Sequence, residues 1–413
     1  MVHILAVLLA INAVLFGNYR QEDKKEPSKD DKKTQEIKRK LEDSYTKATD
    51  WLTKTQNEKG YWGMKTPAGE VSSMGFTCLA SIALINAPAS IKEKNKKSIT
   101  KAVDFIVSSQ NKDGSFSESA GMLKTYCTAL AVQVLCAQDA KTYKKQIDSA
   151  QTWLKSAQTV EGLFEGGSGY GDKEPDKQGG VKTSQAADLS NTGFTAEAMH
   201  MSNLSKDDEY WKKMVAFVQK CQNNSETNTD KKWIDLLKSK GFKVGDDGGS
   251  FYNPDPDNSK AETTDEKDGK VIASYGAMTY HTIKCYLYAG LEKTDPRVKA
   301  AIDWVRKNYT VNYHPGFPFE ETTVAASKRK QNMGLYYYYM VMARALDAFG
   351  ENPFETADKK KHNWAQEITE KLLGMQKEDG TWINENPKWY EGDKLLVTSY
   401  VLNVYNILHK NLK

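Results

Sequence analysis

The sequence predicts an all-α protein built as a ring of six helical hairpins. Of its 413 residues, 39% are hydrophobic and 27% are charged, which is typical of a soluble globular protein. A helical stretch that ends in a short turn with Gly and an aromatic residue recurs along the chain, and no run of residues alternates as strands do. The net charge is only +4, so nucleic acid is not an expected partner.

The N-terminus carries an apolar segment followed by a charged one. Residues 4–16 contain no charge, and their number suits a signal-peptide core better than a membrane-spanning helix. We therefore expect residues 1–17 to form a signal peptide or N-terminal anchor, the protein to be exported, and any membrane attachment to involve this segment alone. Residues 18–45 predict a charged tether that enters the first helix near Ile37.

The repeated turn divides residues 46–413 into six units of one domain. In four copies Gly follows Gln by four residues and an aromatic residue follows that Gly by two; these copies start at Gln56, Gln110, Gln158 and Gln376. Two copies are looser. After Gln222 an insertion at about residues 223–270 delays the turn to Gly248, and in the other copy Tyr309 replaces Gln. Gly allows φ > 0 after a helix, and Gln can bond to groups at helix ends, so the repeat is structural.

Each turn leads into a second helix that opens with small and aromatic residues. Residues 70–77 resemble residues 188–195, and residues 125–128 resemble residues 279–282. Six such hairpins can close into a ring with one helix of each pair inside, around a central cavity. The Tyr, Met, Ala and Thr content of the second helices suits the inner position.

The cysteines and acidic clusters predict no metal site and no cofactor. The five cysteines form no C-x-x-C pair, so neither a disulfide framework nor a paired-cysteine zinc site is expected. The loop from Asp255 to Glu266 has carboxylates at some calcium-binding positions, but Lys260 occupies the position that requires Gly in an EF-hand.

These Gln-x3-Gly-x-Trp/Phe repeats resemble the squalene cyclase and protein prenyltransferase repeat superfamily, whose fold is the (α/α)6 toroid. Residues 274–280 and 334–339 resemble bacterial secreted squalene-cyclase-like repeat proteins. The resemblance covers nearly the whole chain after residue 45. It indicates the fold more specifically than it indicates an activity.

The acid motif of class II terpene cyclases is altered here. These enzymes protonate an alkene or epoxide with an acid of a D-x-D-D-T-A motif, and the best match is Asp188-Leu-Ser-Asn-Thr. Ser190 and Asn191 stand where the family has its paired Asp, and neither a hydroxyl nor an amide can protonate an alkene. Prenyltransferase activity is not expected either, because no Cys follows an Asp by two residues.

Asp188 and His281 are the catalytic candidates if the protein is an enzyme. Asp188 is also a good helix N-cap, and a lone His such as His281 or His200 is more often a core residue than a ligand. The aromatic residues that we expect to bind a ligand in the cavity are Tyr126, Phe194, Tyr275, Tyr280, Tyr337, Tyr338 and Tyr400.

Four functions fit the sequence. We rank first the binding of an isoprenoid or other apolar molecule without ordinary class II cyclase chemistry. The alternatives are an atypical triterpene cyclase or isomerase, a carbohydrate-active (α/α)6 enzyme, and an interaction scaffold with a filled centre. A carbohydrate-active enzyme needs two carboxylates that face each other, for which the candidates are Asp188, Glu197, Glu320 and Glu321.

Overall fold

The computed structural model describes residues 29–67, 69–118, 121–171, 187–258, 260–321 and 323–412. The expected signal peptide or anchor at residues 1–17 lies outside this part of the chain, as do residues 18–28. The first helix, α2 (Lys29–Lys54), begins before the predicted start at Ile37. Its apolar stripe does begin at Ile37, and the Lys, Asp, Gln and Glu residues before it are mostly compatible with a helix.

Twelve helices of the described residues pair into six hairpins, each an outer helix followed by an inner one. The outer helices are α2, α5 (Lys96–Ser108), α7 (Lys144–Ser156), α9 (Glu209–Lys220), α12 (Pro296–Asn308) and α14 (Trp364–Met375). The inner helices are α3 (Met74–Ile85), α6 (Lys124–Asp139), α8 (Leu189–Met201), α11 (Gly276–Tyr288), α13 (Leu335–Phe349) and α15 (Lys394–Asn411).

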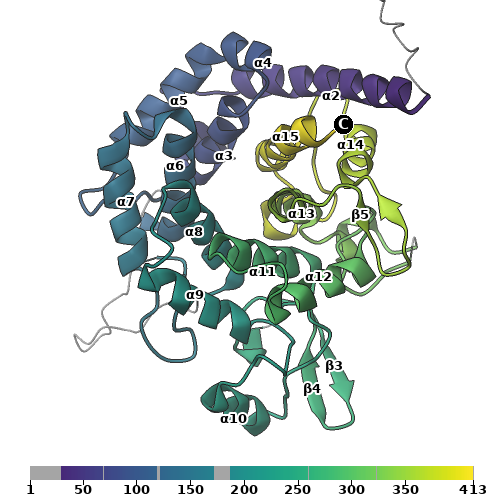
Figure 1. The fold of residues 1–413 in the computed structure, drawn as a ribbon. Helices are drawn as coiled ribbons and strands as arrows, with labels where there is room; N and C mark the ends of the chain where they lie inside the picture. Colours follow the sequence, from purple (N-terminus) through teal and green to yellow (C-terminus); the bar gives the residue numbers. More distant parts are fainter. Residues whose placement is uncertain are drawn as a thin grey trace, which may run out of the picture. The chain divides into compact units, whose positions relative to one another are not determined.

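The inner helices close a ring within residues 37–413. Each contacts the next in sequence, and α15 returns to contact α3 (Figure 1). Nearly all residues of α3 and α8 are buried, whereas the outer helices α5 and α9 bury only one side. A helix that is buried all round lies in the interior of a protein. The predicted (α/α)6 toroid is therefore confirmed.

The repeated Gln joins its unit to the next in five of the six units. The Gln56 side-chain amide donates to the carbonyl of Gly60 in its own turn and to that of Ser98 on the next outer helix, both at 2.9 Å. The last copy closes the ring in the same way, because Gln376 donates to Gly380 at 3.0 Å and to Ser44 on α2 at 3.1 Å. The same pair of bonds is made by Gln110, Gln158 and Gln222.

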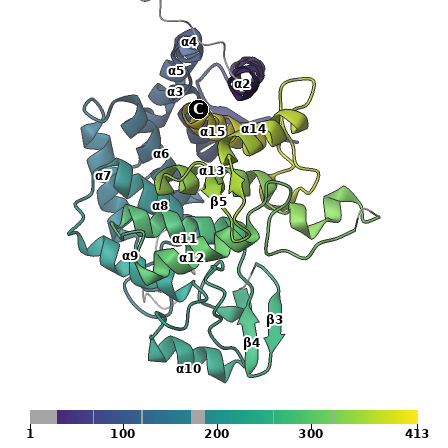
Figure 2. The ribbon, with the colours of Figure 1, turned by 45° about the vertical axis from the view of Figure 1, so that its right-hand side comes forward.

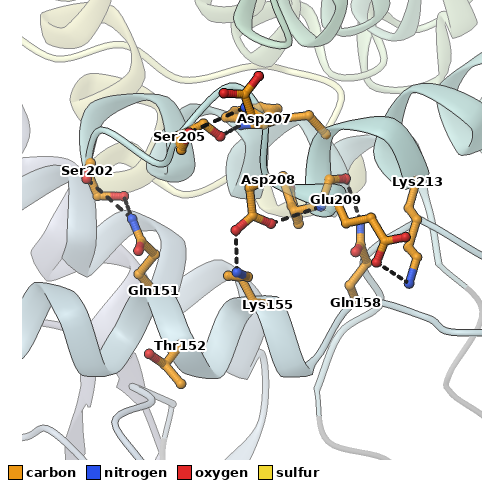
Figure 3. Close-up of polar contacts among 12 residues, drawn as sticks. Gln151, Thr152, Lys155, Gln158, Ser202, Ser205, Asp207, Asp208, Glu209 and Lys213 are labelled. Carbon is orange, nitrogen blue, oxygen red and sulfur yellow. Dashed lines mark hydrogen bonds and ion pairs between the residues drawn. The ribbon is translucent and has the colours of Figure 1, made fainter.

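The third unit departs from the predicted spacing. Gln158 donates to the carbonyl of Gly166 at 2.9 Å, so the structural turn lies four residues beyond the predicted Gly162. Gly166 has φ +87°, and a Cβ there would lie 1.9 Å from the carbonyl oxygen of Lys213. The prediction was wrong at this copy because Gly162 lies at the expected spacing and also has a positive φ, although a Cβ there would meet nothing within 4 Å. Figure 3 shows the neighbouring contacts, in which Lys155 reaches Asp208 across the same boundary.

Short strands and helices interrupt the hairpins, although the sequence predicted no strands. The first turn widens into the antiparallel pair β1 (Trp62–Thr66) and β2 (Gly69–Ser73). The predicted insertion after α9 holds α10 (Lys231–Ser239) and the antiparallel pair β3 (Thr263–Glu266) and β4 (Gly269–Ile272) (Figure 2). The other α-helix and strands of the described residues are α4 (Ala89–Lys94), β5 (Phe354–Glu355) and β6 (Lys361–His362), and four short 3-10 helices lie in the connections.

Candidate functional site at the inner helices

Contacts between α8 and α13 identify the side chains that face the inside of the ring. Helix α11 stands between α8 and α13 in the ring. Side chains of α8 and α13 that touch each other must therefore meet on the side of α11 that faces the ring interior. The Arg344 guanidinium donates to the Glu197 carboxylate at 3.0 Å, and the hydroxyls of Ser190 and Tyr337 are hydrogen-bonded. These four residues therefore face the ring interior.

A threonine near the start of each of five inner helices makes the same hydrogen bond, which shows how these helices align with one another. Its hydroxyl accepts a hydrogen bond from a backbone amide of the preceding turn; the five are Thr77, Thr128, Thr192, Thr279 and Thr398. The sequence comparison had aligned Thr77 with Thr195, and residues 125–128 with residues 279–282, each three residues out of register. The error arose because similar residues recur three positions apart in these segments, so that two alignments look equally good.

With the threonines aligned, the inward positions lie two residues before, two after and five after each threonine. These spacings of four and three residues follow one face of a helix. The inward residues with aromatic or polar side chains are Tyr126, Ser190, Phe194, His281, Tyr400, Gln133, Glu197, Lys284 and Asn403.

Five rings and one hydroxyl meet near the starts of the inner helices, and we call Tyr126, Ser190, Phe194, His281, Tyr337 and Tyr400 the aromatic cluster. The ring of Phe194 lies 5.3 Å from that of Tyr126, 5.9 Å from that of His281 and 6.4 Å from that of Tyr337. Tyr400 lies 6.1 Å from Tyr337. Phe194 is buried, but Tyr126, Tyr337 and Tyr400 keep part of their surface exposed.

Hydrogen bonds link the polar atoms of the aromatic cluster in a chain. The His281 Nε2 and the Tyr337 hydroxyl lie 2.6 Å apart, and the hydroxyls of Tyr126 and Ser190 lie 2.7 Å apart. The His281 Nδ1 has no hydrogen-bond partner among the described residues. Because an unpaired buried donor is costly, the proton of the neutral ring belongs on Nε2. Tyr337 then donates to Ser190, and the Ser190 proton stays available for another acceptor.

Burial keeps His281 neutral. Loss of solvent, followed by the charges of Lys284 and Arg344, holds its pKa well below the usual value. Gly193 makes room for the ring, since a Cβ there would lie 1.9 Å from Nδ1. His281 is therefore a neutral, fixed member of the cluster.

An ion triad lies next to the aromatic cluster in the ring interior. One oxygen of Glu197 accepts from Lys284 at 2.6 Å and from Arg344 at 3.0 Å, and the Lys284 ammonium lies 5.7 Å from the centre of the Phe194 ring. Burial would raise the pKa of Glu197, but Arg344 and Lys284 outweigh it and hold the pKa below its usual value. At this level the side chains of three consecutive inner helices meet inside the ring.

Asp188 caps α8 instead of facing the ring interior as a free acid. Its carboxylate accepts from the Asn191 backbone amide and side-chain amide, both at 2.8 Å, and the Tyr252 hydroxyl is a further partner. The residue is fully buried. Burial raises its pKa to about 6, although these donors act to lower it. Burial thus outweighs the donors, yet with a pKa of about 6 the group is mostly a carboxylate at neutral pH, and its oxygens accept hydrogen bonds.

Three of the predicted ligand-binding residues lie away from the aromatic cluster. The Tyr338 hydroxyl donates to the Thr310 carbonyl at 2.7 Å, and the Tyr280 ring packs against that of Tyr338 at 5.8 Å. Tyr275 packs against His314 and Phe317. All three tyrosines are buried between the helix layers. The structure brings together only Tyr126, Phe194, Tyr337 and Tyr400 of the seven.

Asp188 and Glu197, two of the carboxylates considered for carbohydrate chemistry, do not form a facing pair. Asp188 and Glu197 are nine residues apart along α8, which corresponds to about 13 Å of helical rise, more than either glycosidase geometry uses. Glu197 is also held in the ion triad. Glu320 and Glu321 lie in the connection after α12. His200, on the last turn of α8, stacks on Tyr288 with ring centres 4.4 Å apart.

Buried groups of a following unit cap three inner helices, which sequence reasoning missed. Glu118 accepts from the backbone amides of Met74 and Gly75 at the start of α3. Glu391 accepts from that of Tyr337 at the start of α13. His314 takes this role for α11, since its Nε2 accepts from Ala277 at 3.0 Å. These side chains accept hydrogen bonds from backbone amides that have no partner within the helix. The start of each of these inner helices is therefore built by two units together.

Comparisons with known proteins show what the chain is similar to. Residues 71–243 match the family model of the squalene-hopene cyclase C-terminal domain. No curated protein matches the chain. A variant of the type II terpene cyclase MstE from Scytonema, solved with its product merosterolic acid A, is 13% identical with a TM-score of 0.50, over 91% of this chain and 99% of that chain. The predicted resemblance to the squalene cyclase superfamily is confirmed.

Glycoside hydrolases have the same fold. An inactive variant of the α-1,6-mannanase GH76A of Salegentibacter sp. HEL1_6, in complex with α-1,6-mannotriose, is 10% identical with a TM-score of 0.50 and covers 90% of this chain and 99% of that one. An α-amylase from Clostridium perfringens is 13% identical, with a TM-score of 0.51 over 88% and 97%. Such low identities show a shared fold and leave function to the site. Separately, none of the helices in the described residues is both long and apolar enough to span a membrane.

Proposed function

We propose that this squalene-cyclase-like protein binds an isoprenoid or another largely apolar ligand at the aromatic cluster, without ordinary class II cyclase chemistry. The supporting observation is the convergence of Tyr126 and Tyr337 on the buried Phe194, with Tyr400 beside Tyr337. All three tyrosines are partly exposed. Aromatic faces offer large apolar contact areas to such a ligand. The proposal also includes export of the protein through residues 1–17.

The polar atoms of the cluster favour a ligand with one hydroxyl or carbonyl group. The Ser190 hydroxyl accepts from Tyr126 and Tyr337, and its own proton can be donated to the ligand. A long, wholly apolar chain fits less well, because the charged groups of the Glu197 ion triad lie next to the Phe194 ring. We therefore expect an isoprenoid alcohol to bind more tightly than the corresponding hydrocarbon.

The positions of Asp188 and His281 support the proposed absence of cyclase chemistry. Protonation of an alkene needs a carboxylic acid that carries a proton and faces the substrate. Asp188 accepts hydrogen bonds with both carboxylate oxygens as the N-cap of α8 and is fully buried. His281 is neutral, and its Nε2 is engaged with Tyr337. Neither group is placed to deliver a proton to a ligand at the cluster.

Calorimetric titration of the purified protein with geranylgeraniol tests this proposal. Removal of one lining ring in Tyr400→Ala should weaken binding by about tenfold or more, because burial of an aromatic face contributes roughly 1.5 kcal/mol or more. The matched control is Tyr288→Ala. Tyr288 is a half-buried tyrosine at the C-terminal end of α11, away from the aromatic cluster, so this variant should leave the affinity nearly unchanged. Absence of binding, or equal effects of the two variants, would contradict the proposal.

A second candidate, an interaction scaffold, is supported by the contacts that cross the ring. The pairs Glu197–Arg344 and Ser190–Tyr337 fill part of the interior, as a protein that works through its outer surface would allow. A scaffold predicts no binding of geranylgeraniol and no response of any small-ligand affinity to Tyr400→Ala.

A further inference from the structure

An open hollow of about 720 Å³ lies between two loops at the outside of the sixth unit. One wall is the loop that precedes α15, and the other is the end of the connection that leads into α13. Its lining residues are Ser327, Lys328, Met333, Asn386, Pro387, Lys388, Trp389 and Tyr390. None of them belongs to the aromatic cluster.

The first wall presents two consecutive aromatic rings to solvent. Trp389 is 37% exposed and Tyr390 is 74% exposed. Both have positive φ, +54° and +64°, a region that costs bulky residues of order 1 kcal/mol or more each. Asn386 holds the loop in this shape by donating to the Arg329 carbonyl at 3.1 Å. Gly334 leaves room for the Trp389 ring, which would lie 2.8 Å from a Cβ there.

The charge of the hollow is positive. Lys328 and Lys388 line it and no acidic residue does. Neither lysine forms an ion pair with another residue in the described part of the chain, whereas the nearby Lys330 is paired with Glu262 at 2.5 Å. Two unpaired ammonium groups beside exposed rings complement an anion that carries a ring.

We infer that this hollow binds an acidic saccharide. A sugar ring can lay its C–H face on Trp389 or Tyr390, while its carboxylates pair with Lys328 and Lys388 and its hydroxyls bond to Ser327. A lipid bilayer fits less well, because a flat surface meets protruding side chains and does not enter a hollow. A nucleotide fits less well too, because the wall opposite Trp389 contains Ser327, Lys328 and Met333 and has no second ring to sandwich a base.

This site is independent of the proposed function at the aromatic cluster. The test is titration of the purified full chain with trigalacturonic acid, with galactotriose as its neutral counterpart and AMP as a ring-bearing anion of another class. The affinity of the protein for trigalacturonic acid should be at least about tenfold higher than for galactotriose or AMP. This affinity should fall with added salt.

Variants locate the site. Lys328→Gln combined with Lys388→Gln should weaken trigalacturonic acid binding about tenfold while leaving galactotriose nearly unchanged, and Trp389→Ala should weaken both. The matched charge control is Lys231→Gln with Lys232→Gln, two exposed lysines on α10, and the matched ring control is Phe319→Ala, which is 71% exposed and outside the hollow. Neither control should alter binding.

Three results would overturn the inference. These are the absence of trigalacturonic acid binding at millimolar concentration, equal binding of AMP, and equal losses in the hollow variants and their controls. Circular dichroism of each variant checks that the fold is retained. Geranylgeraniol binding should be unaffected in all of them, so failure here and failure of the aromatic-cluster proposal are separate results.

Discussion

The Glu197 carboxylate on α8 accepts a hydrogen bond from the Arg344 guanidinium on α13 at 3.0 Å, across the inner surface of a ring in which these helices are not neighbours. The same oxygen accepts from Lys284 on the intervening helix α11. One carboxylate thus joins three consecutive inner helices.

Loss of this carboxylate should destabilise the protein strongly. In Glu197→Gln two buried cations lose their counter-charge, and breaking a buried ion pair in this way costs about 3–5 kcal/mol. Urea unfolding measures the change. Asp148→Asn removes the partner of Lys144 in an exposed pair on α7 and should have little effect, so equal losses in the two variants would contradict this role of the triad.

The ring-closing glutamine should matter for stability as well. Gln376→Ala removes two hydrogen bonds, to Gly380 and to Ser44, and we expect a loss of about 1–3 kcal/mol in the free energy of unfolding. Gln366→Ala is a suitable control, since the Gln366 side-chain amide bonds to the exposed Glu370 on the same helix. If Gln376→Ala were as stable as the control, the amide bridge would not contribute to closure.

The third unit allows a test of the corrected repeat alignment. Gly166→Ala should destabilise by more than about 2 kcal/mol, because a positive φ is combined with a Cβ that meets the Lys213 carbonyl at 1.9 Å. Gly162→Ala has a positive φ but no contact, and should cost only about 1 kcal/mol. Thermal unfolding of both variants decides between them, and the reverse order would restore the original alignment.

Glu391 should make stability depend on pH in an unusual direction. Burial raises its pKa from 4.5 to about 7, so between these values the folded state binds more protons than the unfolded state. The contribution of Glu391 is therefore fully present below about pH 4.5 and is lost as the pH rises through about 7, by roughly 3 kcal/mol in all.

The difference between Glu391→Gln and the unmodified protein isolates this effect. The variant should gain in free energy of unfolding relative to the unmodified protein as the pH rises from 4.5 to 8 in a series of urea titrations. Glu321→Gln, at an exposed position, serves as the control and should give a flat difference. A flat difference for Glu391→Gln would show that its pKa is not raised.

Much of the fold could be predicted from the sequence because the turn chemistry repeats. Gln, Gly and an aromatic residue are fixed by hydrogen bonds and a positive φ, so Gln56, Gln110 and Gln376 mark units correctly. Gln158 does not mark its turn because another glycine lies at the expected spacing by chance. The paired strands β1 and β2 were missed because they widen a turn that was expected to be short.

The candidate site was harder to predict because it depends on helix register. Tyr126 and Tyr280 occupy the same place in similar triplets, yet only Tyr126 faces the ring interior. The position of each relative to the threonine that bonds the preceding turn makes the difference, and this signal is present in the sequence. Nothing local predicts that Lys284 and Arg344 meet Glu197, because that contact joins three separate units.

We propose that the aromatic cluster holds an isoprenoid without cyclising it. Gas chromatography with mass spectrometry, on organic extracts after incubation of the purified protein with squalene and with geranylgeraniol, tests this most directly. We predict that both compounds are recovered unchanged, that geranylgeraniol stays with the protein through gel filtration, and that Asp188→Asn makes no difference to the products. A cyclised product that forms with the unmodified protein and disappears in Asp188→Asn or His281→Ala would contradict the claim.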